Sequence, residues 1–135
     1  MSYLLDTDVC IALIRNRPAS ARGRFADVAQ RGMDLFVSSI SLFELWYGCV
    51  KSEHPERNAE RLAIFMAHPT VLDFIEDDAA VAGRIRAELE MKGRVIGAYD
   101  LLVAGQARRA GLILATGNTL VFERVTGLQM ENWLS

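Results

Sequence analysis

The segment AYDLLVAGQARRAGLILATGN, residues 98–118, decides the fold class. Its first half predicts a helix from Ala98 to Ala110, and Gly111 is the residue type that ends helices in a left-handed turn. The apolar run from Leu112 to Ala115 has the length and composition of a buried strand. A helix that leads straight into a short, fully apolar strand is typical of an α/β protein, whose helices cover both faces of a parallel sheet.

The rest of the chain repeats this alternation of apolar strands and helices. Further strands are predicted at 3–5, 35–37, 71–74 and 130–133, with helices at 9–15, 18–30, 41–51, 55–69 and 77–92. A length of 135 residues fits one domain with a core of its own. The sequence therefore predicts a single three-layer α/β/α domain over residues 1–135, built on a central parallel sheet of four to five strands.

The composition limits the classes of function. The net charge of −2 argues against a broadly basic surface for nucleic acid, although a few local arginines would suffice to hold RNA. The two cysteines, Cys10 and Cys49, lie in predicted helices and suit a reducing compartment better than a disulfide framework. No signal peptide and no apolar run near the roughly 18 residues of a membrane span is visible. We expect a cytoplasmic protein without a membrane segment.

Four polar residues stand next to the predicted strands. Asp6 follows the first strand, Glu44 lies early in the helix after the second, Asp100 begins the helix before the fourth, and Asn118 follows that fourth strand. Because ligands of doubly wound sheets bind at the carboxyl ends of the strands, these side chains are candidates for one site. Clustered carboxylates repel one another and suit a hard divalent cation, so a metal site is one hypothesis for this pattern.

Each of these residues also has a purely structural interpretation. Asp6 is suited to cap the first helix, while Thr7 or Asp8 is an equally suitable cap. The spacing of Ser41 and Glu44 matches a capping box. Asp100 is favoured in a first helical turn by the helix dipole, and Asn118 beside Gly117 is typical of a turn. The pattern alone leaves both interpretations open.

Four segments together resemble the VapC toxins of the PIN-domain family. They are LLDTDVCIALI at 4–14, SSISLFELWYG at 38–48, GRVIGAYDLLVAGQARRAGLILATGN at 93–118 and FERVTGLQMENW at 122–133. The resemblance implies a homodimeric α/β/α endoribonuclease, dependent on Mg²⁺ or Mn²⁺ and paired with a VapB antitoxin that brings the complex to promoter DNA. Asp6, Glu44 and Asp100 match the family's acidic ligands. The best single guess for the substrate that the resemblance offers is the anticodon loop of initiator tRNA.

The chain departs from the family pattern around the fourth acidic position. Many PIN domains have aspartate where Asn118 stands, and near relatives with asparagine there often have an acid three residues later, where this chain has Val121. A second metal is therefore in doubt, although the Asn118 amide can still orient a metal-bound water. Asp8 replaces a common asparagine, either as a helix cap or as compensating charge.

Further candidates concern substrate and partner. Lys92 and Arg94 precede the Asp100 helix, and with Arg15 they are candidates to hold RNA phosphates. Trp46 and Tyr47 either belong to the core with their neighbours or contact the antitoxin. Trp133 is expected in the core.

Two other functions remain open at this stage. Asp6 and Asp8, one residue apart after a strand, fit the nucleophile motif of a haloacid-dehalogenase phosphatase, but no paired acids follow near the C-terminus. The missing acid at Val121 fits a catalytically weakened PIN domain that serves as a binding module. The absence of histidine and lysine from the strand ends favours hydrolysis by a metal-activated water, which leaves 5′-phosphate ends.

Overall fold

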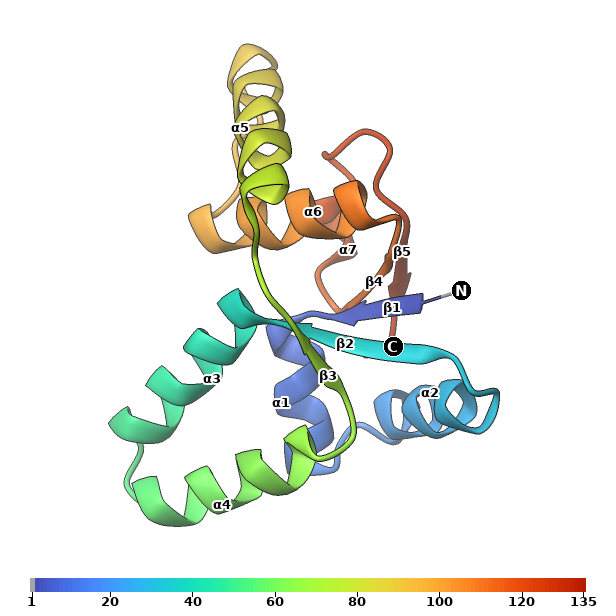
Figure 1. Ribbon diagram of the computed structural model, residues 1–135, viewed down its shortest axis with the longest axis vertical. Coiled ribbons are helices and arrows are strands. Elements are labelled where there is room, and N and C mark those ends of the chain that lie inside the picture. Colours follow the sequence, from blue (N-terminus) through green and yellow to red (C-terminus); the bar gives the residue numbers. More distant parts are fainter. Residues whose placement is uncertain (1) are drawn as a thin grey trace.

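The computed structural model describes residues 2–135, which form one parallel sheet with helices on both faces (Figure 1). The five strands are β1 (Ser2–Leu5), β2 (Asp34–Ser38), β3 (Thr70–Leu72), β4 (Ile113–Thr116) and β5 (Met130–Asn132). They lie in the order β3-β2-β1-β4-β5, and all neighbouring pairs are parallel. From β1 the chain adds β2 and β3 on one side of this strand and then β4 and β5 on the other. The strand order therefore reverses between β1 and β4, which is where ligands of such sheets bind. The predicted fold class is confirmed.

The helices form two layers around this sheet. On one side lie α1 (Thr7–Arg15), α2 (Ala19–Gln30), α3 (Ser39–Lys51) and α4 (Pro55–Met66). On the other side lie α5 (Glu76–Met91), α6 (Ala98–Ala110) and the short α7 (Thr119–Phe122). In Figure 1, α5 extends away from the sheet and crosses α6 steeply. No helix within residues 2–135 is both long enough and apolar enough to cross a membrane.

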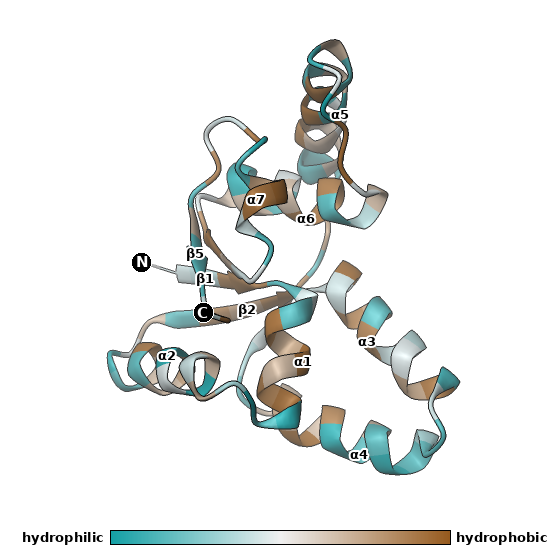
Figure 2. Cartoon of the chain, turned by 180° about the vertical axis from the view of Figure 1, so that it is seen from behind, coloured by the Kyte–Doolittle hydropathy of each residue, from teal (hydrophilic) through white to brown (hydrophobic). Residues whose placement is uncertain are grey.

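Alternating side chains of the strands divide the core between the two faces. Leu5 packs with Val9, Val37 and Trp133 on the side of α1–α4, whereas Leu4 packs on the opposite side with the residues of α5–α7. Both leucines are fully buried. Figure 2 shows this as hydrophobic strands at the centre and hydrophilic stretches along the outer helices. The expected burial of Trp133 is confirmed.

Several predicted helix ends differ from the structure. The first helix begins at Thr7 because the Asp6 carboxylate accepts the Thr7 N–H at 2.9 Å, so the predicted caps Thr7 and Asp8 are wrong. The third helix begins at Ser39, capped by Ser38 Oγ, which accepts the Ile40 N–H at 3.1 Å. The capping box predicted from Ser41 is therefore wrong as well, because Ser41 already lies inside the helix.

Candidate active site

The site forms where β1 and β4 end side by side. Asp6, the residue after β1, donates its backbone N–H to the Ala115 carbonyl at 2.9 Å, which continues the pairing of the two strands. Its side chain is only 7% exposed. One carboxylate oxygen accepts the Thr7 N–H at 2.9 Å, and the other accepts the Thr116 hydroxyl at 2.8 Å. Asp6 is thus held in part by Thr116, which lies 110 positions away in the sequence.

Asp8 lies one residue further along α1 and faces the same strand end. Its Oδ2 accepts the backbone N–H of Gly117 at 3.0 Å. Its Oδ1 is buried and has no hydrogen-bond partner. A Cβ on Gly117 would collide with the Leu134 side chain and lie 3.0 Å from Asp8 Oδ2, so a larger residue there would have to displace both side chains.

Glu44 reaches the site from the second turn of α3. The Thr7 hydroxyl donates to Glu44 Oε1 at 2.9 Å, so the first residue of α1 fixes a carboxylate that comes from another helix. The sequence placed Glu44 in the first turn, beside a cap at Ser41; the earlier start at Ser39 moves it one turn inward. A hydrogen bond across helices, rather than a local cap, therefore positions this residue.

Asp100 is the third residue of α6 and completes the acidic cluster of Asp6, Asp8, Glu44 and Asp100. Burial raises the pKa of Asp100, and the charges of Glu44 and Asp8 raise it further. Burial, followed by the charge of Asp8, raises the pKa of Asp6 to about 7. Burial also raises the pKa of Asp8, against the lowering effect of its bond to the Gly117 N–H. The charges of Glu44, Asp8 and Asp100 thus act on one another's neighbours across three helices.

Asn118 and Val121 contribute less to this region. Asn118 is exposed at the start of α7, and its backbone N–H donates to the Thr116 hydroxyl at 3.0 Å. No hydrogen bond within residues 2–135 links its side-chain amide to the acids. Val121 lies inside α7, a helix that the sequence pattern did not predict. The water-orienting role expected for Asn118 stays a prediction.

The donor set suits a hard divalent cation. It offers carboxylates and hydroxyls without histidine or cysteine, which is the chemistry that Mg²⁺ and Mn²⁺ prefer. The buried, partnerless Asp8 Oδ1 is an acceptor that a cation or its water would satisfy. No three acidic, histidine or cysteine side chains within residues 2–135 enclose an ion by themselves. Mg²⁺ usually keeps several of its waters, and these would span the remaining distances.

The three residues predicted to hold RNA occupy two different places. Arg15, near the end of α1, lines a groove of about 210 Å³ between α1, α3 and α4 together with Glu44, Leu45 and Arg61. Lys92 and Arg94 are exposed in the connection between α5 and α6, which leads to Asp100. Arg15 thus lines the same groove as Glu44. Lys92 and Arg94 are related to the cluster only through the chain segment that leads to Asp100.

The aromatic residues around Glu44 are not core residues, contrary to one interpretation of the sequence. Phe43, Trp46 and Tyr47 are 53%, 46% and 56% exposed, and only Leu45 points inward. The Phe43 ring meets Tyr99 of α6 edge-on, with ring centroids 5.6 Å apart. An apolar stripe thus faces solvent along α3, and the prediction that Trp46 and Tyr47 contact a partner stays open.

Sequence reasoning missed two threonines that build the site. Thr7 orients Glu44, and the fully buried Thr116 orients Asp6 while also accepting the Asn118 N–H. Their only signal in the sequence is a position directly beside a strand end. A hydroxyl at such a position is also common in ordinary turns, so the signal was too weak to use.

A PIN-domain family model matches residues 3–128 of the chain. The chain belongs to the PIN-domain family. This PIN domain is 46% identical over 133 residues to the tRNA(fMet)-specific endonuclease VapC of Shigella flexneri, covering 98% of each chain. It is 42% identical over 134 residues to the ribonuclease VapC2 of Haemophilus influenzae, covering 99% of each. The resemblance inferred from the four sequence segments is confirmed.

Solved structures give the same relationship. VapBC2 from Rickettsia felis, bound to a DNA fragment from their promoter, contains a chain that matches with a TM-score of 0.93 and 37% identity, over 98% of this chain and 99% of that one. DNA-bound VapBC from Salmonella typhimurium matches with a TM-score of 0.90 and 41% identity, over 98% of both chains. These relatives favour the nuclease interpretation of this PIN domain over a phosphatase or a module without activity.

Proposed function

We propose that this PIN domain is a metal-dependent endoribonuclease, the toxin of a VapB–VapC toxin–antitoxin pair. The proposal is supported by the acids beside the ends of β1 and β4, where Thr116 holds Asp6 and Thr7 holds Glu44, and where the charge of Glu44 raises the pKa of Asp100. It is also supported by relatives that are named ribonucleases. Burial and mutual repulsion make this cluster costly in the absence of a cation, so stability alone does not explain it.

Three carboxylates of the site would hold the cation, and the neighbouring hydroxyls set their geometry. When bound, Mg²⁺ or Mn²⁺ lowers the pKa of a water and neutralises charge on the phosphate. The Thr116 hydroxyl and the Thr7 N–H fix both oxygens of Asp6. The Thr7 hydroxyl fixes one oxygen of Glu44. The ligand groups are therefore oriented before any cation or RNA arrives, which lowers the cost of binding both.

The substrate that best fits the relatives is tRNA, and the anticodon loop of initiator tRNA is the most specific target we propose. An excess of acid at the site repels phosphates, so attraction must come from positive side chains at its edge. Lys92 and Arg94 precede α6, and Arg15 lies in the groove beside Glu44. Contacts from these residues to the RNA backbone would place the strand without reading its sequence.

The partner we propose is a VapB-type antitoxin, and promoter DNA would be bound through that complex. The groove between α1, α3 and α4 has an apolar floor that includes Leu45 and Leu62, with arginines and Glu44 around it. A segment of the partner lying in this groove would end beside the acidic cluster. Trp46 and Tyr47 are exposed on the same helix α3 and suit anchoring contacts. We further propose that the toxin is a homodimer.

Cleavage assays with defined RNA ends test the catalytic proposal. Purified protein should cleave tRNA with Mg²⁺ or Mn²⁺, lose activity in EDTA and regain it when the metal is restored. A metal-activated water leaves 5′-phosphate and 3′-hydroxyl ends. Cleavage in EDTA that leaves 2′,3′-cyclic phosphates would overturn the proposal, because that route uses the RNA's own 2′-hydroxyl and needs no metal.

The RNA target is tested in cells. Expression without the antitoxin should arrest growth, and sequencing of RNA 5′ ends should show one dominant new end in the anticodon loop of initiator tRNA. Expression of a variant with Asp100→Asn is the matched control. New ends scattered over messenger RNA would reject the tRNA target while leaving the nuclease activity in place.

A further inference from the structure

Asp8 is a half-buried acid whose Oδ1 oxygen is buried without a structural task. It does not cap α1, because the Asp6 carboxylate does so. Its one hydrogen bond within residues 2–135 is from the Gly117 N–H, and Oδ1 is buried without a partner. No arginine, lysine or histidine within residues 2–135 forms an ion pair with Asp8. A carboxylate with one buried oxygen that no donor satisfies is a cost that a ligand at that oxygen would remove.

The position of Asp8 relates it to the other acids. The Asp8 carboxylate binds the Gly117 N–H, directly beside Thr116, whose hydroxyl binds Asp6, and the charge of Asp8 raises the pKa of both Asp6 and Asp100. The Gly117 N–H holds Oδ2 on the side of the β4–α7 loop, which leaves Oδ1 as the free oxygen. The same loop carries Asn118, which brings no carboxylate, and Val121 behind it brings no oxygen at all. Asp8 on α1 thus supplies a carboxylate next to a loop that has none of its own.

We infer that Asp8 supplies the fourth carboxylate of the cation site, in place of the acid missing at Asn118 and Val121. The inference rests on the proposed metal-dependent function. Coulomb energy gives its physical reason, since a divalent ion attracts a carboxylate twice as strongly as a second carboxylate repels it at equal distance. At equal distance this attraction only balances the repulsion from Asp6 and Asp100 together, so Asp8 is attracted on balance when a coordinated cation lies closer to it than those two acids do.

The substitution Asp8→Asn isolates the charge from the hydrogen bond. The asparagine carbonyl can still accept the Gly117 N–H, so the contact between α1 and the loop survives, while the negative charge is lost. Asp34→Asn is the matched control, because it removes the same charge at the start of β2, at the opposite edge of the sheet. The full-length protein is stripped with EDTA and titrated with Mn²⁺, and free Mn²⁺ is followed by its electron paramagnetic resonance signal.

We expect Asp8→Asn to weaken Mn²⁺ binding at least about ten-fold, and Asp34→Asn to leave it unchanged. The rise in melting temperature that Mn²⁺ gives should shrink in parallel in Asp8→Asn. Wild-type affinity in Asp8→Asn would overturn the inference and leave Asp8 as an anchor for Gly117 only. Wild-type protein that binds no Mn²⁺ and cleaves no RNA would overturn the proposed function itself, so the two failures are distinguishable.

Asp8→Asn can also be checked for an altered fold. Protection of the Gly117 amide from hydrogen exchange reports the bond to residue 8 directly. Retained protection together with weakened Mn²⁺ binding assigns the loss to the carboxylate charge. The contrary result would be that Asp8→Asn loses both the protection of Gly117 and the Mn²⁺ affinity, while Asp8→Ser retains both. That result would overturn the inference, because serine keeps an acceptor without a charge.

Discussion

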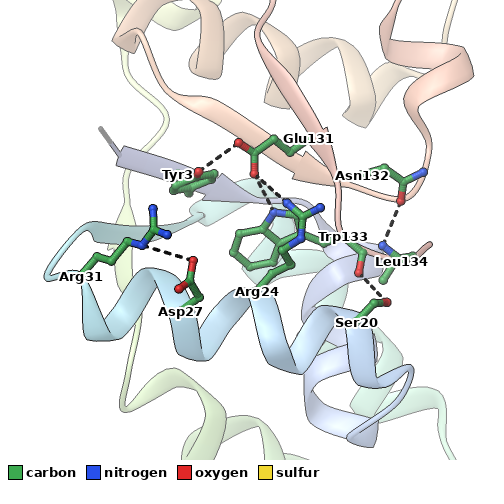
Figure 3. A network of polar contacts seen from close by, with 9 residues as sticks. All are labelled: Tyr3, Ser20, Arg24, Asp27, Arg31, Glu131, Asn132, Trp133 and Leu134. Atoms are coloured by element: carbon green, nitrogen blue, oxygen red, sulfur yellow. Dashed lines mark hydrogen bonds and ion pairs between the residues drawn. The ribbon is translucent and has the colours of Figure 1, made fainter.

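Two parts of the molecule surround carboxylates in opposite ways. At the corner between β5 and α2, Glu131 accepts hydrogen bonds from the Tyr3 hydroxyl at 3.0 Å and the Trp133 indole at 3.2 Å, and it pairs with Arg24 at 3.5 Å (Figure 3). The Tyr3 and Trp133 rings also pack together, with centroids 5.5 Å apart. Each oxygen of Glu131 has a donor, and a positive charge lies beside it.

The acidic cluster at the ends of β1 and β4 lacks such a full set of donors and, in the part of the chain that the structure describes, an ion pair with a positive side chain. Its carboxylates raise one another's pKa, and Asp8 Oδ1 has no donor among residues 2–135. Both sites lie beside strands of the same sheet, so their position in the sheet does not explain why Glu131 has donors for both oxygens and Asp8 does not. The Glu131 corner is built to stabilise the fold, whereas the cluster keeps acceptors unmatched for a ligand. The following predictions separate the two sites by stability and by activity.

The largest effect is expected at the cluster, on activity. Asp100→Asn and Glu44→Gln should each lower the rate of RNA cleavage by more than about 100-fold, beyond the loss typical of residues that only support a ligand. Their melting temperatures should stay the same or rise, because each substitution removes repulsion. Single-turnover cleavage and thermal unfolding of the metal-free protein measure both. An Asp100→Asn enzyme with the wild-type rate would show that the site is misplaced.

The second prediction concerns the pH dependence of stability in the metal-free protein. The pKa of Asp6 is raised from 3.8 to about 7, so between these values the folded state binds more protons than the unfolded state. The free energy of unfolding should therefore fall as the pH rises from about 4 to about 7, by a few kcal/mol, and then level off. The shifts of Asp8 and Asp100 have the same sign.

Urea unfolding in EDTA at pH 5 and pH 7.5 measures this dependence. Asp6→Asn is the control, because asparagine can still accept the Thr7 N–H but cannot ionise. The wild-type protein should lose more stability than Asp6→Asn between the two pH values. An equal loss in both proteins would contradict the raised pKa of Asp6.

A smaller loss, in stability alone, is expected at the Glu131 corner. Glu131→Ala leaves the Tyr3 hydroxyl and the Trp133 indole without their acceptor, which should cost about 1–3 kcal/mol in the free energy of unfolding. Asp27→Ala is the comparison, since it breaks only the exposed pair with Arg31 and should change stability by less than about 1 kcal/mol. Both variants should cleave RNA at the wild-type rate; a large loss of activity in Glu131→Ala would remove the contrast between the two sites.

The smallest effect is expected for the basic loop before α6. The double substitution Lys92→Ala, Arg94→Ala should weaken RNA binding modestly and reduce the slope of log affinity against log salt by about 1.4. Arg86→Ala, on the exposed side of α5 where it pairs with Glu90, should leave the slope unchanged. Fluorescence titrations at several salt concentrations measure this. An unchanged slope in the double variant would exclude phosphate contacts by the loop.

The sequence by itself determined the alternation of elements, and the metal-binding roles that it assigned to Asp6, Glu44 and Asp100 stay predictions. Helix α6 was predicted from Ala98 to Ala110 with the bounds that the structure has, because Gly111 provides the left-handed turn at φ 68° that ends it. Asp6 and Asp100 were placed at the correct edge because parallel strands point their carboxyl ends the same way. These features depend on local composition and on a general rule of sheet geometry, and both can be read from a single chain.

Only the tertiary structure decided how the site is held and which side chains lie inside. The bond from Thr116 to Asp6 exists because β1 pairs with β4, and a strand pairing across more than a hundred residues leaves no local trace. The role of Asp8 likewise depends on the approach of Gly117. The exposure of Trp46 and Tyr47 depends on which helices cover α3, since apolar composition shows that a residue favours burial but not whether a neighbour is there to bury it.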